Sequence, residues 1–203
     1  MSILIALVGN TGVGKTTLAR ALCAARPFAT GLEQHTERPF QTLFKSDARY
    51  ALANQVDYLL LRAEQERALR AQPLPALIDG GLEQDYYGFT QLFHARGLLS
   101  DAETALLERL YAALRASLPP PDLFVYLYAD VATLRARLAA RDRINIATPQ
   151  DLTLLDSLLT RWLDTVEPGR LLRLDVSRAA PDYSNVVPEL LQKINTLTSN
   201  DLI

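Results

Sequence analysis

The chain has 203 residues, of which 49% are hydrophobic and 22% charged, a composition typical of a water-soluble protein with one domain and a sizeable core. Its 21 basic and 23 acidic residues leave a net charge of −2, which argues against a protein that wraps a nucleic-acid polymer. Cys23 is the only cysteine, which excludes an intrachain disulfide, and the apolar start of the chain is too short to span a membrane, so we expect a cytoplasmic protein.

The segment Gly9–Thr17, G-N-T-G-V-G-K-T-T, matches the phosphate-loop pattern G-x-x-x-x-G-K-[ST]. Residues 3–8 before it predict a buried strand, and residues 15–25 after it consist mostly of good helix formers. In this context Lys15 can reach the β- and γ-phosphates of ATP or another nucleoside triphosphate, and Thr16 can offer its hydroxyl to Mg²⁺. The alternative, a glycine-rich turn that binds nothing, fits the order of strand, motif and helix less well. The predicted nucleotide contacts come from Gly9, Asn10, Thr11, Gly12, Val13, Gly14, Lys15, Thr16 and Thr17.

Two further predicted strands end on carboxylates. Residues 27–33 weakly favour a strand, which would place Glu33 at its end. After a helix predicted from Asp47 to Arg70, residues 76–79 indicate a short buried strand that ends on Asp79. Proteins with a phosphate loop keep an aspartate near Mg²⁺ at such a place, so Asp79 is a candidate metal ligand.

The rest of the chain alternates between helical and strand patterns. The predicted elements are helix 83–95, a helix capped by Ser100, strand 123–128, a helix capped by Asp130, a helix capped by Thr148, strand 171–176 and a helix from about residue 184. Strands that alternate with helices indicate a parallel sheet with helices on both faces. We therefore expect a single α/β domain over residues 1–203, with about five strands in a P-loop kinase-like three-layer fold.

An arginine cluster and one glutamate are the candidates for chemistry on the phosphate. Arg137 and Arg141 lie four residues apart on one helix face, where two like charges repel unless an anion lies between them, and Arg143 follows. A solvated basic face is the alternative, but beside a phosphate loop we favour a phosphate-binding lid near residues 137–148. Glu33 is placed to accept a proton from a hydroxyl that attacks the γ-phosphate, and a solvent-exposed glutamate is the alternative there.

Three polar residues interrupt segments that otherwise form core helices: Gln55, Arg62 and Asp85. An amide, a guanidinium and a carboxylate together can bind the edge of a base. Each of the three alone would be an ordinary surface residue. We therefore predict a nucleoside-binding site only from their combination.

From Ile3 to about Trp162 the chain resembles the deoxynucleoside kinase family, especially its bacterial deoxyadenosine and deoxyguanosine kinase-like members. The resemblance rests on the phosphate loop, Glu33 before the E-R-P-F of Glu37–Phe40, the interval from Gln55 to Arg62, the interval from Asp79 to Asp85, and the R-x-x-x-R-x-R of Arg137, Arg141 and Arg143. It implies transfer of a γ-phosphate to the 5′-hydroxyl of a deoxynucleoside, with Glu33 as general base and the three arginines closing over the phosphate. It also implies a homodimer, or a heterodimer with a related subunit, joined through two long helices with broad apolar stripes.

The chain departs from the family pattern at three places. Asp79-Gly80-Gly81 replaces D/E-R-S, so the arginine that steadies the general base is absent, and we expect the lid arginines to supply that cation. Phe44 stands where relatives often place a tyrosine on the sugar 3′-hydroxyl, and residues 144–146 replace acidic residues. Two alternatives stay open: a catalytically weak nucleotide-binding partner subunit, and a nucleoside monophosphate kinase.

Overall fold

Five strands form one parallel sheet in the computed structural model, which describes residues 2–31, 38–139, 148 and 150–200. The strands are β1 (Leu4–Gly9), β2 (Ala29–Gly31), β3 (Ala76–Asp79), β4 (Leu123–Tyr128) and β5 (Leu171–Asp175). They pair in the order β2-β3-β1-β4-β5, and each pairing within the described chain is parallel. The predicted α/β class and the predicted number of strands are confirmed.

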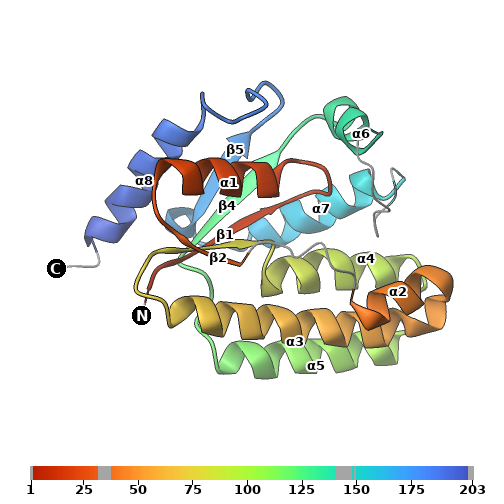
Figure 1. Ribbon diagram of the computed structural model, residues 1–203. Coiled ribbons are helices and arrows are strands. Elements are labelled where there is room, and N and C mark those ends of the chain that lie inside the picture. Colours follow the sequence, from red (N-terminus) through yellow and green to blue (C-terminus); the bar gives the residue numbers. More distant parts are fainter. Residues whose placement is uncertain (1, 32–37, 140–147, 149, 201–203) are drawn as a thin grey trace.

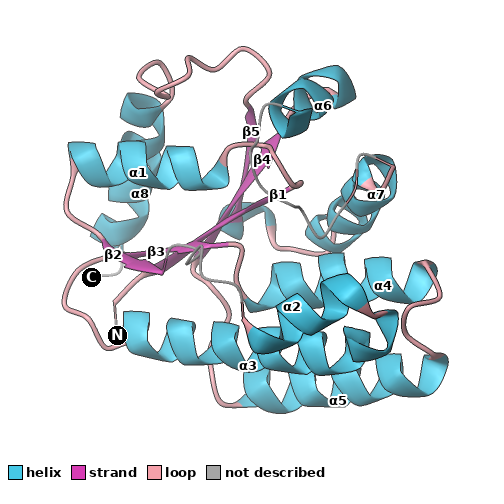
Figure 2. Cartoon of the chain, turned by 45° about the vertical axis from the view of Figure 1, so that its right-hand side comes forward, coloured by secondary structure: helices cyan, strands magenta, loops and turns pink. Residues whose placement is uncertain are grey.

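Helices cover both faces of the sheet (Figure 1, Figure 2). One face carries α1 (Lys15–Ala25), α6 (Val131–Ala139) and α8 (Val187–Asn200). The other carries α2 (Pro39–Ser46), α3 (Ala51–Arg70), α4 (Gln91–Ala95), α5 (Asp101–Ala116) and α7 (Leu152–Leu163). Short helical turns occur at Ala48–Tyr50 and Pro168–Arg170, and a π-helix at Gln84–Thr90 leads into α4. None of the helices in the described ranges is long and apolar enough to cross a membrane.

Side chains along the central strand β1 alternate between two cores. Leu4, Ala6 and Val8 pack on the side of α3, α5 and α7. Ile5 and Leu7 pack on the side of α1, α6 and α8. All five are fully buried, which is why this strand is a continuous apolar run in the sequence rather than an alternation of apolar and polar residues.

Two helices begin later than the sequence pattern predicts. The Asp47 carboxylate accepts the backbone N–H of Arg49 at 3.0 Å and caps the short turn Ala48–Tyr50, so α3 begins only after that turn. Thr148 was expected to cap α7, but its N–H and its hydroxyl both donate to the Asp151 carboxylate at 2.7 Å. In both places a local side-chain bond to the backbone replaces the first helical turn.

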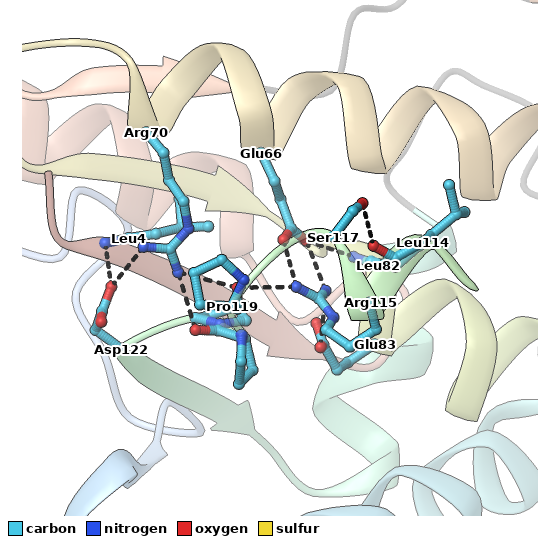
Figure 3. A network of polar contacts seen from close by, with 12 residues as sticks. Leu4, Glu66, Arg70, Leu82, Glu83, Leu114, Arg115, Ser117, Pro119 and Asp122 are labelled. Atoms are coloured by element: carbon cyan, nitrogen blue, oxygen red, sulfur yellow. Dashed lines mark hydrogen bonds and ion pairs between the residues drawn. The ribbon is translucent and has the colours of Figure 1, made fainter. Parts of the chain in front are cut away.

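A buried polar network joins α3, α5 and the turn after β3 (Figure 3). Arg115 donates to both carboxylate oxygens of Glu66, at 2.9 and 3.2 Å, and lies 2.8 Å from Glu83. Glu66 in turn accepts the backbone N–H of Leu82 at 3.1 Å. Burial raises the pKa of Glu83 to about 7, although the Arg115 charge opposes that rise. The network therefore fixes the chain directly after the end of β3.

Two arginines tie down the proline loop at the amino ends of the strands. Arg70 donates to the carbonyl oxygens of Pro119 at 3.2 Å and Pro120 at 2.9 Å. Arg170 donates to the carbonyl oxygens of Pro120 at 3.2 Å and Pro121 at 2.5 Å. These bonds lie at the edge formed by the amino ends of the strands. Open parallel sheets bind ligands at the opposite edge, formed by the carboxyl ends of the strands.

Candidate active site

The phosphate loop joins the end of β1 to the start of α1, as the sequence predicts. Gly9, Gly12 and Gly14 have φ values of 145°, 84° and 108°, which glycine adopts without strain. A side chain at Gly9 is excluded, because its Cβ would lie 2.3 Å from the carbonyl oxygen of Leu127. A loop curled in this way can turn successive backbone N–H groups toward one anion.

Two side chains brace this loop. The Lys15 ammonium donates to the carbonyl oxygens of Gly9 at 2.9 Å and Asn10 at 3.1 Å. The buried Asn10 amide donates to the carbonyl oxygen of Leu152 at 2.8 Å, and its own oxygen accepts the Thr11 N–H at 2.8 Å. The lysine charge therefore lies within the loop, and Asn10 ties the loop to the start of α7.

The two predicted metal ligands lie side by side. Parallel pairing of β1 with β3 sets Leu7 beside Asp79, so the carboxylate emerges next to the phosphate loop. The Thr16 hydroxyl donates to Asp79 Oδ2 at 2.5 Å. A hydroxyl and a carboxylate are the oxygen ligands that Mg²⁺ takes in nucleotide sites, where phosphates and water complete the coordination. These two residues therefore fit a nucleotide-bound magnesium ion.

The turn after β3 has no side chains of its own. Gly80 and Gly81 have φ values of 88° and 95°, in the left-handed region that favours glycine. The guanidinium of Arg62 lies against this turn, with Nη2 3.4 Å from the place where a Cβ on Gly80 would stand. The cation that borders the turn is thus Arg62 of α3, and the sequence did not predict it there.

The three residues predicted to bind a nucleoside base are brought together. Arg62 Nε donates to Asp85 Oδ2 at 2.7 Å, and both side chains are only 6% exposed. Gln55 donates to the hydroxyl of Thr90 at 2.8 Å and lies 3.4 Å from the carbonyl oxygen of Asp85. Gln65 accepts from Arg62 Nη1 at 3.1 Å and so helps to fix the guanidinium plane.

A glutamine that sequence reasoning missed links the two halves of the site. Gln84 is buried, and its Oε1 accepts the backbone N–H of Gly9 at 2.9 Å. Its Nε2 lies 3.5 Å from the place of a Cβ on Gly80. The signal in the sequence that could have indicated Gln84 was a second polar residue, next to Asp85, in a buried segment.

The predicted sugar contact Phe44 is half-buried and packs on the ring of Phe93, with 4.9 Å between ring centres.

The predicted catalytic residues are only partly within the described chain. Arg137 belongs to α6, and its guanidinium donates to the carbonyl oxygens of Val13 at 2.8 Å and Val176 at 2.9 Å. It therefore contacts the backbone of the phosphate loop. Glu33, Arg141, Arg143 and most of the predicted lid lie outside the described residues.

Comparison with known proteins settles the family. The model of the deoxynucleoside kinase family matches residues 5–199. The chain belongs to the deoxynucleoside kinase family. It is 25% identical over 143 residues to the deoxyadenosine/deoxycytidine kinase of Bacillus subtilis (strain 168), across 69% of this chain and 66% of that protein. It is 26% identical over 146 residues to the deoxyguanosine kinase of the same organism, across 68% and 67% of the two chains.

Solved structures of this family have the same fold. The deoxyadenosine kinase from M. mycoides with bound dATP has a TM-score of 0.78 and 17% identity, over 95% of this chain and 100% of that one. The same enzyme with bound dCTP has a TM-score of 0.79 and 16% identity, over 96% and 100%. These structures confirm the P-loop kinase-like fold, and the family model and the two relatives confirm the predicted family and the nucleoside kinase class.

Proposed function

We propose that this chain transfers the γ-phosphate of ATP, or of another nucleoside triphosphate, to the 5′-hydroxyl of a (deoxy)nucleoside. One observation carries the proposal: the phosphate loop, with Thr16 bonded to Asp79, shares the carboxyl edge of the sheet with the buried Arg62–Asp85 pair. Gln84 bonds to the loop at Gly9 and so connects the two groups. A loop for phosphates beside a polar site for a base is the arrangement that such a transfer needs.

On the phosphate side, the backbone N–H groups of the loop and the Lys15 ammonium bind the triphosphate and neutralise the charge that develops on it. The bonds that Lys15 makes to the carbonyl oxygens of Gly9 and Asn10 keep its charge in the loop before nucleotide arrives. Thr16 and Asp79 would hold Mg²⁺, which supplies further positive charge to the phosphates when bound.

On the nucleoside side, Gln55, Arg62 and Asp85 bind the base, and Phe44 borders the sugar. The buried pair of Arg62 with Asp85 fixes the carboxylate, and the Thr90 hydroxyl fixes the Gln55 amide. Polar groups held in this way discriminate strongly between bases, because a base with the wrong donors leaves them unpaired.

Glu33 is proposed to accept the proton from the 5′-hydroxyl, and Arg141 and Arg143 to face the transferring phosphate. These assignments are carried by the family pattern, with Glu33 following β2 closely in the sequence. Arg137, the first of these three arginines in the sequence, lies near the end of α6.

We also propose that the protein is cytoplasmic and acts in nucleotide salvage, and that it forms a dimer through α3 and α5. These two helices pack against one another, yet each exposes a large apolar residue: Leu60 is 41% exposed and Leu106 47%. A second copy, or a related subunit, would bury both side chains. Sedimentation of the wild type and of Leu106→Glu tests this, because a monomeric wild type contradicts the dimer.

The transfer itself is tested by incubating the purified chain with Mg²⁺, ATP and each common nucleoside and nucleoside monophosphate, and by following ADP release. Phosphorylation of at least one nucleoside is expected. Phosphorylation of monophosphates alone would replace the proposal with a monophosphate kinase. Saturable nucleotide binding without transfer to any acceptor would leave the weakly catalytic partner subunit.

A further inference from the structure

One residue far from the phosphate loop in sequence has an unusual backbone. Tyr183 has a φ of 59°, and it is the one non-glycine residue of the described chain with a positive φ. This conformation strains the backbone of a bulky residue. It persists only where the surrounding structure enforces it, and it often marks a functional site. Tyr183 lies between β5 and α8, and its carbonyl oxygen accepts the N–H groups of Val186 at 2.9 Å and Val187 at 3.0 Å.

The strained backbone places the Tyr183 side chain against the phosphate loop, at Val13 and Gly14. The residue is 3% exposed, and its hydroxyl donates to the carbonyl oxygen of Val13 at 3.1 Å. The ring packs so closely on the loop that a Cβ on Gly14 would lie 2.1 Å from the tyrosine oxygen. Two constraints therefore require glycine at position 14: the positive φ of its backbone, and the Tyr183 side chain that leaves no room for a Cβ.

The same carbonyl oxygen accepts a second, charged donor. Arg137 Nη1 donates to Val13 at 2.8 Å, while Nη2 donates to the carbonyl oxygen of Val176 at 2.9 Å. A hydrogen bond from a guanidinium is shorter and stronger than one between neutral groups. Val13 is thus held by α6 through Arg137 and by the segment before α8 through Tyr183.

The Val13 carbonyl and the Gly14 N–H belong to one peptide group. The peptide bonds of the described chain are all trans, so this C=O and this N–H point in opposite directions. The hydrogen bonds from Arg137 and Tyr183 to the Val13 carbonyl oxygen prevent rotation of the peptide plane and polarise the peptide group. The N–H of Gly14 is then kept pointing away from the Val13 carbonyl oxygen and its two donors, Tyr183 and Arg137.

We propose that Tyr183 and Arg137 are positioning residues that lock the Val13–Gly14 peptide, so that the Gly14 N–H is preorganised to bind a phosphate oxygen. This inference rests on the proposed function only in assigning the loop to a triphosphate. It gives Arg137 a task that it performs through the loop rather than by touching the transferring group.

The test uses Tyr183→Phe, Arg137→Gln and Arg137→Lys in the full chain. Calorimetric titration measures the dissociation constants of inorganic tripolyphosphate and of ADP, and separately of the best nucleoside. Two matched controls remove similar bonds elsewhere. Tyr126→Phe removes a tyrosine hydroxyl that donates to Asp156 at 2.9 Å, and Arg170→Gln removes an arginine that donates to two carbonyl oxygens.

Tyr183→Phe is expected to weaken tripolyphosphate and ADP about fivefold, and Arg137→Gln about tenfold or more, with nucleoside affinity unchanged. Arg137→Lys should weaken both phosphate ligands nearly as much, because lysine keeps the charge and loses the fork that reaches two carbonyls. The control variants should bind all ligands as the wild type does.

Four results would overturn the inference. Folded Tyr183→Phe and Arg137→Gln variants with wild-type tripolyphosphate affinity would show that the Val13 carbonyl needs no brace. Full affinity in Arg137→Lys would show that only the charge matters. Equal losses for nucleoside and tripolyphosphate, with a lower melting temperature, would show a merely structural role. A wild type that binds neither tripolyphosphate nor ADP would remove the triphosphate site itself, and with it both proposals.

Discussion

The phosphate side and the nucleoside side of the site are built in opposite ways. The phosphate side comes from one continuous segment, Gly9–Thr17, whose shape follows from the backbone of three glycines. The nucleoside side is assembled from α3 and the π-helix, whose residues Arg62 and Asp85 stand 23 positions apart. A loop that binds through its backbone depends on the side chains that hold that backbone in place, whereas a site made of buried side chains uses the same contacts for binding and for folding.

Lys15→Ala should have the largest effect and should separate the two sides most clearly. Turnover is expected to fall about 10³-fold, because a cation aimed at the transferring phosphate is lost. Nucleoside affinity should not change, and the melting temperature should fall only slightly, since Lys15 loses its bonds to two carbonyl oxygens of the loop. Steady-state transfer and scanning calorimetry measure both, with Lys193→Ala on α8 as the control. Turnover within about tenfold of the wild type would contradict the phosphate-loop assignment.

Glu33→Gln should lower turnover about 10²-fold, because an amide cannot accept the proton of the 5′-hydroxyl. Affinity for nucleoside should be retained, since the amide still forms hydrogen bonds. Single-turnover transfer and equilibrium binding give the two quantities, and Glu189→Gln on α8 serves as the control. A loss smaller than about threefold would mean that Glu33 is not the general base.

Asp85→Ala should alter which nucleoside is preferred, changing the ratio of kcat/KM between bases by about tenfold or more. It should also lower the melting temperature, because Arg62 would lose its buried carboxylate partner. Asp57→Ala breaks the more exposed pair with Arg38 and is the matched control. If all nucleosides slow equally, the pair serves the fold alone and the two sides differ less than we propose.

The smallest effect is expected from the buried network beneath the turn that joins the two sides. Burial raises the pKa of Glu83 from an ordinary 4.5 to about 7, so between these values the folded chain binds a proton that the unfolded chain has released. The free energy of unfolding therefore falls as pH rises through this window. Arg115 faces this carboxyl and lowers its pKa, whereas the Glu66 charge raises it.

Glu83→Gln should remove that fall, which amounts to roughly 5 °C in melting temperature between about pH 5 and about pH 8. Calorimetry at the two pH values measures it, with Glu108→Gln on the exposed side of α5 as the control. An identical pH dependence in the wild type and in Glu83→Gln would show that Glu83 is already ionised in the folded chain.

The sequence predicts best what depends on neighbouring residues. The strand, phosphate loop and helix, the Asp79 strand end and the Ser100 capping box all follow from local patterns, and the structure shows each of them. The sheet class followed as well, because alternation of strands and helices leaves few other arrangements.

What the sequence did not predict depends on tertiary contacts between distant residues. The bond of Gln84 to Gly9 spans 75 positions, and that of Arg137 to Val13 spans 124. The hydrophobic periodicity of neighbouring residues does not indicate partners so far apart in the sequence. The positive φ of Tyr183 was equally hidden, since propensity alone argues against it at a tyrosine. The Gln55, Arg62 and Asp85 grouping was predicted because three polar residues interrupt segments that otherwise form core helices, and the family resemblance supports it.

The diglycine turn also limits which substitutions position 80 can accept. With φ at 88°, any residue other than glycine at position 80 is penalised, and its Cβ would stand 3.4 Å from Arg62 Nη2, in contact with that guanidinium. An arginine at position 80 would therefore combine a strained backbone with a second cation beside the Arg62 guanidinium. Gly80→Arg, one of the two changes that separate Asp79-Gly80-Gly81 from D-R-S, is expected to yield a less stable protein rather than a more active kinase.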